Sequence, residues 1–269
     1  MMQALSAAED SMRAHAPPII ETRDLVRHFG GLRAVDGLSL TLRRGEMVGL
    51  IGPNGAGKTT LFNLIAGSLT PSAGKIIIAG REVSRAGPER RIGLGVARTF
   101  QIPRPFPEMT VLENVLTGRQ MQAGEKIWMN FVRPGRVAAE ERAAVDKARS
   151  LIDFVALSRL EGAPARALSG GQRKLLELAR VLMADPAAIL LDEPAAGVNP
   201  ALLELIIDRV SALNARGATI LLIEHNMDMV ARLCRRVIVM AAGRRLTEGA
   251  PAEVAREPAV IAAYLGDAA

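Results

Sequence analysis

A nine-residue stretch of the chain has the residue types and spacing that hold a polyphosphate. It fits the pattern G-x-x-x-x-G-K-[ST], and its residues in order are Gly52, Pro53, Asn54, Gly55, Ala56, Gly57, Lys58, Thr59 and Thr60. Glycines let backbone N–H groups close around phosphates, and a following helix directs its positive dipole end at the same anion. Lys58 can then reach the β- and γ-phosphates, and the Thr59 hydroxyl can ligate Mg²⁺. The stretch predicts a nucleotide site, against the alternative of a glycine-rich turn that matches by chance.

Two further groups of polar residues follow apolar runs that are typical of buried strands. Asp192-Glu193 directly follows the apolar run at residues 187–191, and Glu224-His225 directly follows the run at residues 219–223. Sites in α/β proteins lie at the carboxyl ends of strands. We therefore expect Asp192 to hold Mg²⁺ through water, Glu193 to polarise an attacking water, and His225 to lie beside the γ-phosphate. The alternatives are an ordinary helix start for the acidic pair and a structural role for the histidine.

Between these motifs lies a segment with two overlapping signals, Ser169, Gly170, Gly171 and Gln172. Ser169 and Gln172 have the spacing of a capping box, which predicts the start of a helix through residues 173–183. Capping does not explain the two glycines, because glycine is unfavourable in the first turn of a helix. A serine and two glycines at a helix N-terminus are also the signal of a second phosphate site.

The elements that must position these groups alternate between strand and helix. Apolar or alternating runs predict strands at residues 38–42, 47–51, 75–78, 96–101, 187–191 and 219–223, with an edge strand and its continuation at 19–27. Helical patterns cover residues 61–66, 109–116, 138–155 and 200–213, and a hairpin is expected around residues 237–247. The alternation predicts an α/β fold with a mainly parallel sheet covered on both faces.

Composition limits the class of protein. The chain of 269 residues contains no run of eighteen apolar residues, and we expect residues 1–17 to be a disordered leader without a secretory signal. The formal charge is +6, and the basic residues are scattered along the chain. This scatter and the small number of aromatic residues argue against nucleic acid as a partner. An anionic membrane surface would also explain the positive charge. The single Cys234 excludes an intramolecular disulfide and is interpreted as a small apolar core residue.

Together these residues resemble the nucleotide-binding subunit of ATP-binding-cassette (ABC) transporters, over about residues 19–266. The resemblance implies a P-loop NTPase fold in one domain at 18–269, with an antiparallel β subdomain near the N-terminus and an α-helical signature subdomain inserted at about 102–183. It implies ATP and Mg²⁺ as cofactors, and two ATP molecules held in a head-to-tail dimer. In such a dimer, Ser169 and Gly171 would contact the γ-phosphate bound by the partner.

The same resemblance gives roles to two residues outside the first three motifs. Gln101 would contact Mg²⁺ and the membrane partner, and the proline-rich segment that follows it would pass the motion to the membrane. Phe29 would stack on the adenine, at a position where the family usually has tyrosine. From the sequence alone, Phe29 is equally well interpreted as a core phenylalanine.

Several shorter motifs look like the subgroup that serves branched-chain amino-acid import: residues 29–31, 97–101, 196–200, 224–227 and 263–266, with an inserted arm at 118–137. This likeness implies permease subunits, a second ATPase subunit (a copy or a paralogue), a periplasmic binding protein as an indirect partner, and a peripheral position on the cytoplasmic face of the inner membrane. ATPases of urea import and lipopolysaccharide export are the alternatives within the family.

Rivals of other classes fit less of the sequence. Soluble ABC ATPases that act on ribosomes carry two cassettes, whereas this chain has one. Those that act on DNA have a long coiled coil, whereas residues 71–167 here lack sustained heptads. An ordinary GTPase or small-molecule kinase would leave the segment at Ser169 and His225 unexplained.

Overall fold

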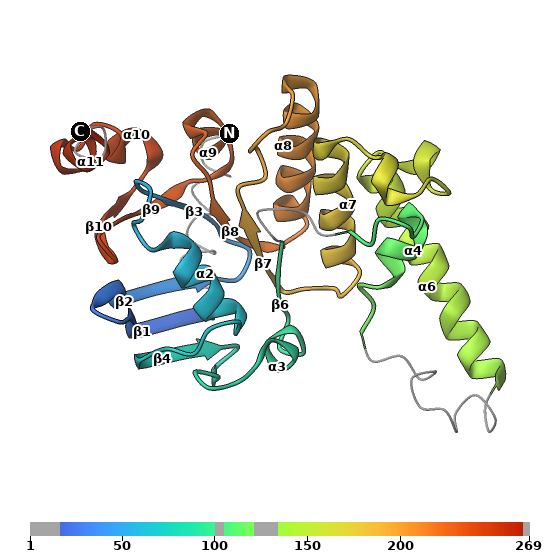
Figure 1. Cartoon of the computed structure of the whole chain (residues 1–269), viewed down its shortest axis with the longest axis horizontal. Helices are drawn as coiled ribbons and strands as arrows, with labels where there is room; N and C mark the ends of the chain where they lie inside the picture. Colours follow the sequence, from blue (N-terminus) through green and yellow to red (C-terminus); the bar gives the residue numbers. More distant parts are fainter. Residues whose placement is uncertain (1–16, 100–104, 121–133, 266–269) are drawn as a thin grey trace, which may run out of the picture. The chain divides into compact units, whose positions relative to one another are not determined.

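The computed structural model of the chain describes residues 17–99, 105–120 and 134–265 (Figure 1). Among these residues, no helix is both long enough and apolar enough to cross a membrane. Three predictions concern segments that lie wholly or mostly outside the described residues: the leader at 1–17, Gln101, and the arm at 118–137.

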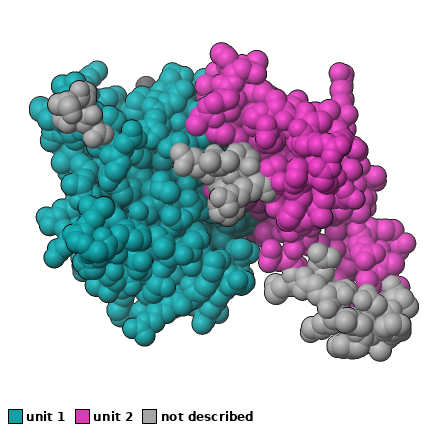
Figure 2. All heavy atoms as spheres, in the orientation of Figure 1, with its two compact units in different colours: residues 1–98, 186–195, 210–269 teal, residues 99–185, 196–209 magenta. Residues whose placement is uncertain are grey.

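The chain divides into two compact units, which Figure 2 colours separately. Unit 1 contains residues 1–98, 186–195 and 210–269, and unit 2 contains residues 99–185 and 196–209. Unit 2 thus holds the segment in which the helical subdomain is predicted, together with a stretch after Glu193 that the prediction did not include.

A six-stranded sheet forms the centre of unit 1. Its order is β10-β9-β3-β8-β7-β6, and every neighbouring pair is parallel except β9 with β10. All residues of the three middle strands β3, β8 and β7 are buried, as expected for a parallel sheet covered on both faces. The strands are β3 (Met47–Ile51), β6 (Val96–Arg98), β7 (Ala188–Asp192), β8 (Thr219–Ile223), β9 (Arg236–Ala241) and β10 (Arg244–Gly249).

The second sheet of unit 1 is antiparallel, in the order β2-β1-β4-β5. Its strands are β1 (Pro18–Phe29), β2 (Leu32–Arg43), β4 (Ala73–Ile78) and β5 (Arg81–Glu82). The expectation that residues 19–27 form an edge strand is wrong, because β1 pairs with β2 on one side and β4 on the other. A bulge at Asp24, which has a positive φ of 45°, shifts the register of β1 without ending the strand.

Helix α2 (Lys58–Ala66) joins the two sheets through one hydrophobic cluster, in which its Leu61, Phe62, Leu64 and Ile65 meet side chains of both. It ends at Gly67 with φ 88°, as the sequence predicts. The buried guanidinium of Arg91, from α3 (Pro88–Ile92), donates to the carbonyls of Leu64 and Ile65 in the last turn. The Leu64 carbonyl also accepts the N–H of Gly67. Arg91 adds donors to these last-turn carbonyls and brings a positive charge to the negative end of the helix dipole. Burial lowers the pKa of Arg91 to about 10.

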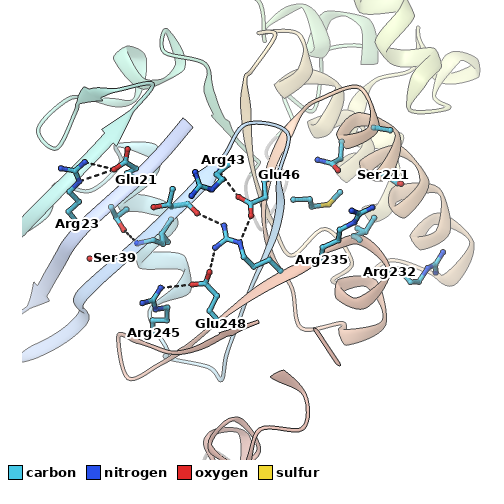
Figure 3. A pocket seen from close by; sticks show the side chains of 18 residues that line it. Glu21, Arg23, Ser39, Arg43, Glu46, Ser211, Arg232, Arg235, Arg245 and Glu248 are labelled. Carbon is cyan, nitrogen blue, oxygen red and sulfur yellow. Dashed lines mark hydrogen bonds and ion pairs between the residues drawn. The ribbon is translucent and has the colours of Figure 1, made fainter. Parts of the chain in front are cut away.

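A polar recess of about 850 Å³ lies where the two sheets of unit 1 meet (Figure 3). At its centre Arg236 donates to Glu46 Oε1 at 2.7 Å, Glu248 Oε1 at 2.6 Å and the Thr41 carbonyl at 2.7 Å. Burial lowers the pKa of Arg236, but hydrogen bonds and charge from the two glutamates raise it above its ordinary value. The cluster ties β9 to β2, β10 and the start of β3. Its lining shares no residue with the motifs predicted to carry chemistry.

The described part of unit 1 closes with short helices, and the hairpin predicted around residues 237–247 is confirmed. Ala242 and Gly243 both have positive φ, 47° and 79°, which gives the tight turn between β9 and β10. The helices are α9 (Met227–Leu233), α10 (Pro251–Val254) and α11 (Pro258–Leu265).

Unit 2 is helical in its described part. Helices α4 (Val111–Leu116), α6 (Pro134–Phe154) and α7 (Gly170–Leu182) pack on one another, with the 3₁₀ turns Ser158–Leu160 and Ala165–Ala167 between them. The spacing predicts one apolar face for α6 from Val145, Ala148, Leu151, Ile152 and Val155. Ala148 and Ile152 are buried, Val155 is buried just beyond the helix end, and Val145 and Leu151 are only half-buried. Helix α8 (Pro200–Ala215) starts in this unit, where the Asn199 side chain accepts a hydrogen bond from the Leu202 N–H.

Candidate active site

The phosphate-binding loop connects β3 to α2 and has the backbone that its glycines permit. Gly52, Gly55 and Gly57 have φ of 145°, 73° and 97°. A Cβ at Gly52 would lie 2.0 Å from the Met240 carbonyl oxygen, and one at Gly57 would lie 2.1 Å from the Ala34 carbonyl oxygen. No side chain caps the first turn of α2, because its N-cap is Gly57. The loop therefore presents the start of a helix dipole without a protein anion on it.

Lys58 lies inside this loop. Its ammonium donates to the Gly52 carbonyl at 2.6 Å and to the Pro53 carbonyl at 2.8 Å, and the residue is buried. Thr59, the next residue, is exposed. The loop therefore holds a cation within its curve, which is the charge that a polyphosphate requires.

Asp192 ends β7 and has a fully buried side chain. Arg98, at the end of β6, donates to Asp192 Oδ2 at 2.6 Å and to the side-chain oxygen of Asn63 on α2. The guanidinium also lies over the Phe62 ring, 5.6 Å from its centroid. Arg98 thus links the strand before the predicted Gln101 segment to the helix of the phosphate loop.

The donor set predicted for Mg²⁺ has the right chemistry. The ion is usually bound by one or two carboxylates together with substrate phosphates and water, and Asp192 and the Thr59 hydroxyl are oxygen donors of that kind. Both belong to unit 1. Gln101, the third predicted ligand, lies outside the described residues.

Glu193 and His225 are brought together by the loops after β7 and β8. Glu193 Oε1 lies 3.1 Å from His225 Nε2, and the Glu193 N–H donates to the Ile223 carbonyl at 2.9 Å. Glu193 has a positive φ of 48°, which is costly for a residue with a side chain and marks a functional turn when the surroundings maintain it. The imidazole is partly exposed and the carboxylate mostly buried.

Glu224 is a residue of this site whose role the sequence did not reveal. Its carboxylate is buried and accepts backbone N–H groups from Ala195 at 2.6 Å, His225 at 3.0 Å and Asn226 at 3.2 Å. The signal was present, since Glu224 directly precedes His225, but its donor Ala195 belongs to another strand's loop.

Two aromatic residues of unit 1, Phe29 and Tyr264, bear on the nucleotide site. Phe29, at the end of β1, is exposed, and the Arg27 guanidinium lies 4.7 Å from its ring centroid. The exposure excludes the alternative of a core phenylalanine. Tyr264 of α11 has its pKa raised by burial, partly offset by a hydrogen bond from the Gly52 backbone. The C-terminal segment thus contacts the first glycine of the phosphate loop, which the sequence analysis missed.

The segment at Ser169 belongs to unit 2 and starts α7 with the predicted capping box. Ser169 Oγ accepts the Gln172 N–H at 3.3 Å, and Gln172 Oε1 accepts the Ser169 N–H at 2.9 Å. A Cβ at Gly171 would lie 2.7 Å from Leu202 Cδ1, so a side chain there would require Leu202 to move. Around Gly170 nothing lies within 4 Å of an added Cβ. Its lack of a side chain is therefore not explained by contacts of the described chain.

The chain is similar to known proteins of one family. A family model described as "ABC transporter" matches residues 35–196, and one described as "Branched-chain amino acid ATP-binding cassette transporter" matches residues 244–269. The probable branched-chain amino acid transport ATP-binding protein LivG of Archaeoglobus fulgidus is 38% identical over 248 residues, covering 92% of this chain and 95% of its own. The high-affinity branched-chain amino acid transport ATP-binding protein LivG of Salmonella typhimurium is also 38% identical, with 93% and 99% covered.

Solved structures give the same result for the fold. A nucleotide-free ATP-binding cassette from an ABC transporter superposes with a TM-score of 0.80 at 37% identity, covering 91% of this chain and 98% of that one. The ADP conformation of another cassette from an ABC transporter gives a TM-score of 0.79 at 35% identity, covering 93% and 100%. The predicted fold class, a P-loop cassette with a mainly parallel sheet and an antiparallel sheet, is confirmed.

Proposed function

Since the chain belongs to the ABC transporter family of ATP-binding proteins, we propose that it is the ATP-hydrolysing subunit of an importer for branched-chain or other hydrophobic amino acids. One arrangement carries the proposal. The adjacent strands β3, β8 and β7 are parallel, and they end respectively in the phosphate loop, in His225, and in Asp192-Glu193. Carboxyl ends of neighbouring parallel strands meet at one edge of the sheet, so phosphate binding and water activation share that edge.

Each group then has a role that its environment supports. The loop backbone and Lys58 bind the phosphates of ATP, and the Thr59 hydroxyl and Asp192 hold Mg²⁺. The ion, when bound, neutralises charge that develops on the phosphates. Glu193 orients and polarises the attacking water, and His225, within hydrogen-bond distance of Glu193, contacts the γ-phosphate. Phe29 offers an exposed ring for the adenine.

Unit 2 supplies the part of the site that acts on a second subunit. Ser169, Gly170, Gly171 and Gln172 present the N-terminus of α7, and the open surface at Gly170 leaves room for an approaching γ-phosphate. Two subunits in a head-to-tail dimer then enclose two ATP molecules, with Gln101 passing closure to the permease. Completion of the site by closure excludes water and makes the isolated subunit slow.

The amino-acid cargo rests on the relatives and on the end of the chain. The relatives that cover it almost completely are named for branched-chain amino acid transport, and the corresponding family model matches residues 244–269. In that segment Tyr264 contacts the phosphate loop. The subunit then works peripherally at the cytoplasmic face of the membrane, with permease subunits, a second ATPase and, indirectly, a periplasmic binding protein.

Affinity purification of the tagged chain from its native membranes in mild detergent, followed by mass spectrometry, tests this assignment. We expect two different permeases and a second ATPase to copurify. The cognate binding protein should bind leucine, isoleucine or valine in a binding assay. Two export-type membrane subunits with a single ATPase species would contradict the cargo and favour lipopolysaccharide export. A binding protein specific for urea would contradict it equally. Ribosomal partners without any membrane protein would contradict transport itself.

A further inference from the structure

Glu224 connects the two catalytic loops of unit 1. Its Oε1 accepts the N–H of Ala195, two residues after Glu193, and its Oε2 accepts the N–H groups of His225 and Asn226. The ladder between β7 and β8 ends with the pair Asp192 and Ile223. Beyond that pair, the loops are joined by the Glu193 N–H on the Ile223 carbonyl and by the Glu224 carboxylate.

The chemistry of these three bonds is specific to a carboxylate. Two oxygens with about four lone-pair sites accept three N–H groups, whereas a glutamine at the same place offers one acceptor oxygen and two N–H donors. Such a glutamine would direct a donor at a backbone N–H. Glu224 is only 2% exposed, so water cannot restore the lost bonds without rearrangement of the loop.

An ordinary capping role does not account for Glu224. Helix α9 begins just after His225, but its N-terminus already has a cap, since the Asn226 side chain accepts the Met229 N–H at 3.0 Å. What Glu224 adds is the bond to Ala195, which comes from the loop of the neighbouring strand. The strained backbone of Glu193, with φ 48°, lies between the strand end and that bond. A strained turn persists only where its surroundings fix it on both sides.

We propose that Glu224 is a positioning residue for ATP hydrolysis, which sets the separation between Glu193 and His225 by holding both loops on one buried carboxylate. The inference rests on the proposed function and adds a residue to it. Glu224 touches neither nucleotide nor water in this account and acts through the other two. A loss of the carboxylate lets the 3.1 Å contact between Glu193 and His225 open without disturbing the phosphate loop.

The test uses Glu224→Gln in the full-length chain, alone and within the assembled transporter. We expect kcat for ATP to fall about tenfold or more, since misplacement by 1 Å costs up to about a hundredfold. The Kd of a fluorescent ATP analogue should change less than about twofold, because the phosphate loop is untouched. The control is Glu253→Gln, in which another carboxylate of unit 1 that accepts a backbone N–H, from Ala250, is changed at an exposed helix start.

A double-mutant cycle with His225→Gln separates positioning from a general loss of stability. Because Glu224 acts through the pair Glu193 and His225, Glu224→Gln should slow the His225→Gln variant by a smaller factor than it slows the parent protein. Fully multiplicative losses would overturn the proposal, as would an unchanged kcat in Glu224→Gln. Glu224→Asp, which keeps the charge, should recover part of kcat, and it provides the comparison if the glutamine variant unfolds.

The proposed function is tested separately, with the unsubstituted protein. Absence of ATP hydrolysis by the assembled complex of the unsubstituted protein would contradict the function itself. If that complex hydrolyses ATP and Glu224→Gln hydrolyses it at the same rate, only the positioning role is contradicted.

Discussion

Arg98 Nη2 lies 2.6 Å from Asp192 Oδ2, so the carboxylate expected to face Mg²⁺ is also the partner of a guanidinium. The side chains are 10% and 0% exposed. Removing one member of such a pair leaves a buried charge that water cannot reach. If Asp192 holds Mg²⁺ as proposed, folding and cofactor binding depend on the same carboxylate.

Arg98→Gln should lower the free energy of unfolding by about 3 kcal/mol, because it removes the guanidinium that pairs with the buried Asp192 carboxylate. Saturating Mg²⁺ and ATP should recover about 1 kcal/mol or more of this loss, since a bound cation again faces the carboxylate. Chemical denaturation with and without Mg²⁺ and ATP measures both values.

The control for this variant is Arg23→Gln, which breaks an exposed pair with Glu21 and should cost less than about 1 kcal/mol under both conditions. If the loss in Arg98→Gln is the same with and without the nucleotide, Arg98 stabilises the fold independently of the site.

The glycines of the phosphate loop should differ in their tolerance of a methyl group. Gly52→Ala forces a Cβ to within 2.0 Å of the Met240 carbonyl oxygen, whereas Gly55→Ala meets open space and strains only its own backbone. We expect a loss of about 3 kcal/mol or more for Gly52→Ala and about 1–2 kcal/mol for Gly55→Ala. Thermal unfolding of the two variants checks the difference, and equal losses would show that the loop backbone moves to relieve the clash.

Much of unit 1 follows from hydrophobic patterns that are local in the sequence. The runs at 47–51 and 219–223 are strands at those residues because continuous apolar residues between turn signals suit a doubly covered sheet. The motifs at Gly52, Asp192 and His225 could be placed at strand ends for the same reason. The edge-strand prediction for β1 failed, because β1 pairs on its second side with β4, which follows the phosphate loop and α2 in the chain, and the local pattern does not reveal this pairing.

What the sequence did not reveal depends on groups far apart in the chain. Arg98 and Asp192 are separated by 94 positions, and Glu224 and Ala195 by 29. Each pair forms only when neighbouring parallel strands bring their ends together. Gly171 shows the same limit, because its close approach to Leu202 is visible only in the folded chain. Roles assigned through the family to Gln101 and to the partner-facing Ser169 stay predictions.

Cys234 should be unreactive in the folded protein. The thiol is 3% exposed, and burial raises its pKa to about 12. At pH 8 we expect labelling by a thiol-specific reagent to occur only through unfolding, so its rate should follow denaturant concentration. Because Cys234 is the only cysteine of the chain, the label reports this one site.

The same shift has a defined effect on stability. The thiol of the unfolded chain ionises near its ordinary pKa of 9.0, whereas burial raises the pKa of the folded thiol to about 12. The contribution of this group to the free energy of unfolding is therefore complete below pH 9 and is lost as the pH rises from 9 toward 12. Cys234→Ala should remove this part of the alkaline destabilisation. Rapid labelling of the folded protein at pH 8 would contradict the burial.

Glu193→Gln should separate nucleotide binding from hydrolysis. The variant keeps the size of the side chain and its 3.1 Å neighbour His225, but it removes the carboxylate that we propose polarises water. We expect kcat to fall by about a hundredfold or more, as for loss of a general base. The affinity for ATP should not change, because the phosphate loop and Lys58 are intact. ATP-bound subunits should then accumulate as closed dimers, which light scattering during gel filtration detects. Unchanged turnover would remove Glu193 from its role. Failure to form a closed dimer with ATP bound, both alone and with the second ATPase subunit present, would contradict the head-to-tail dimer.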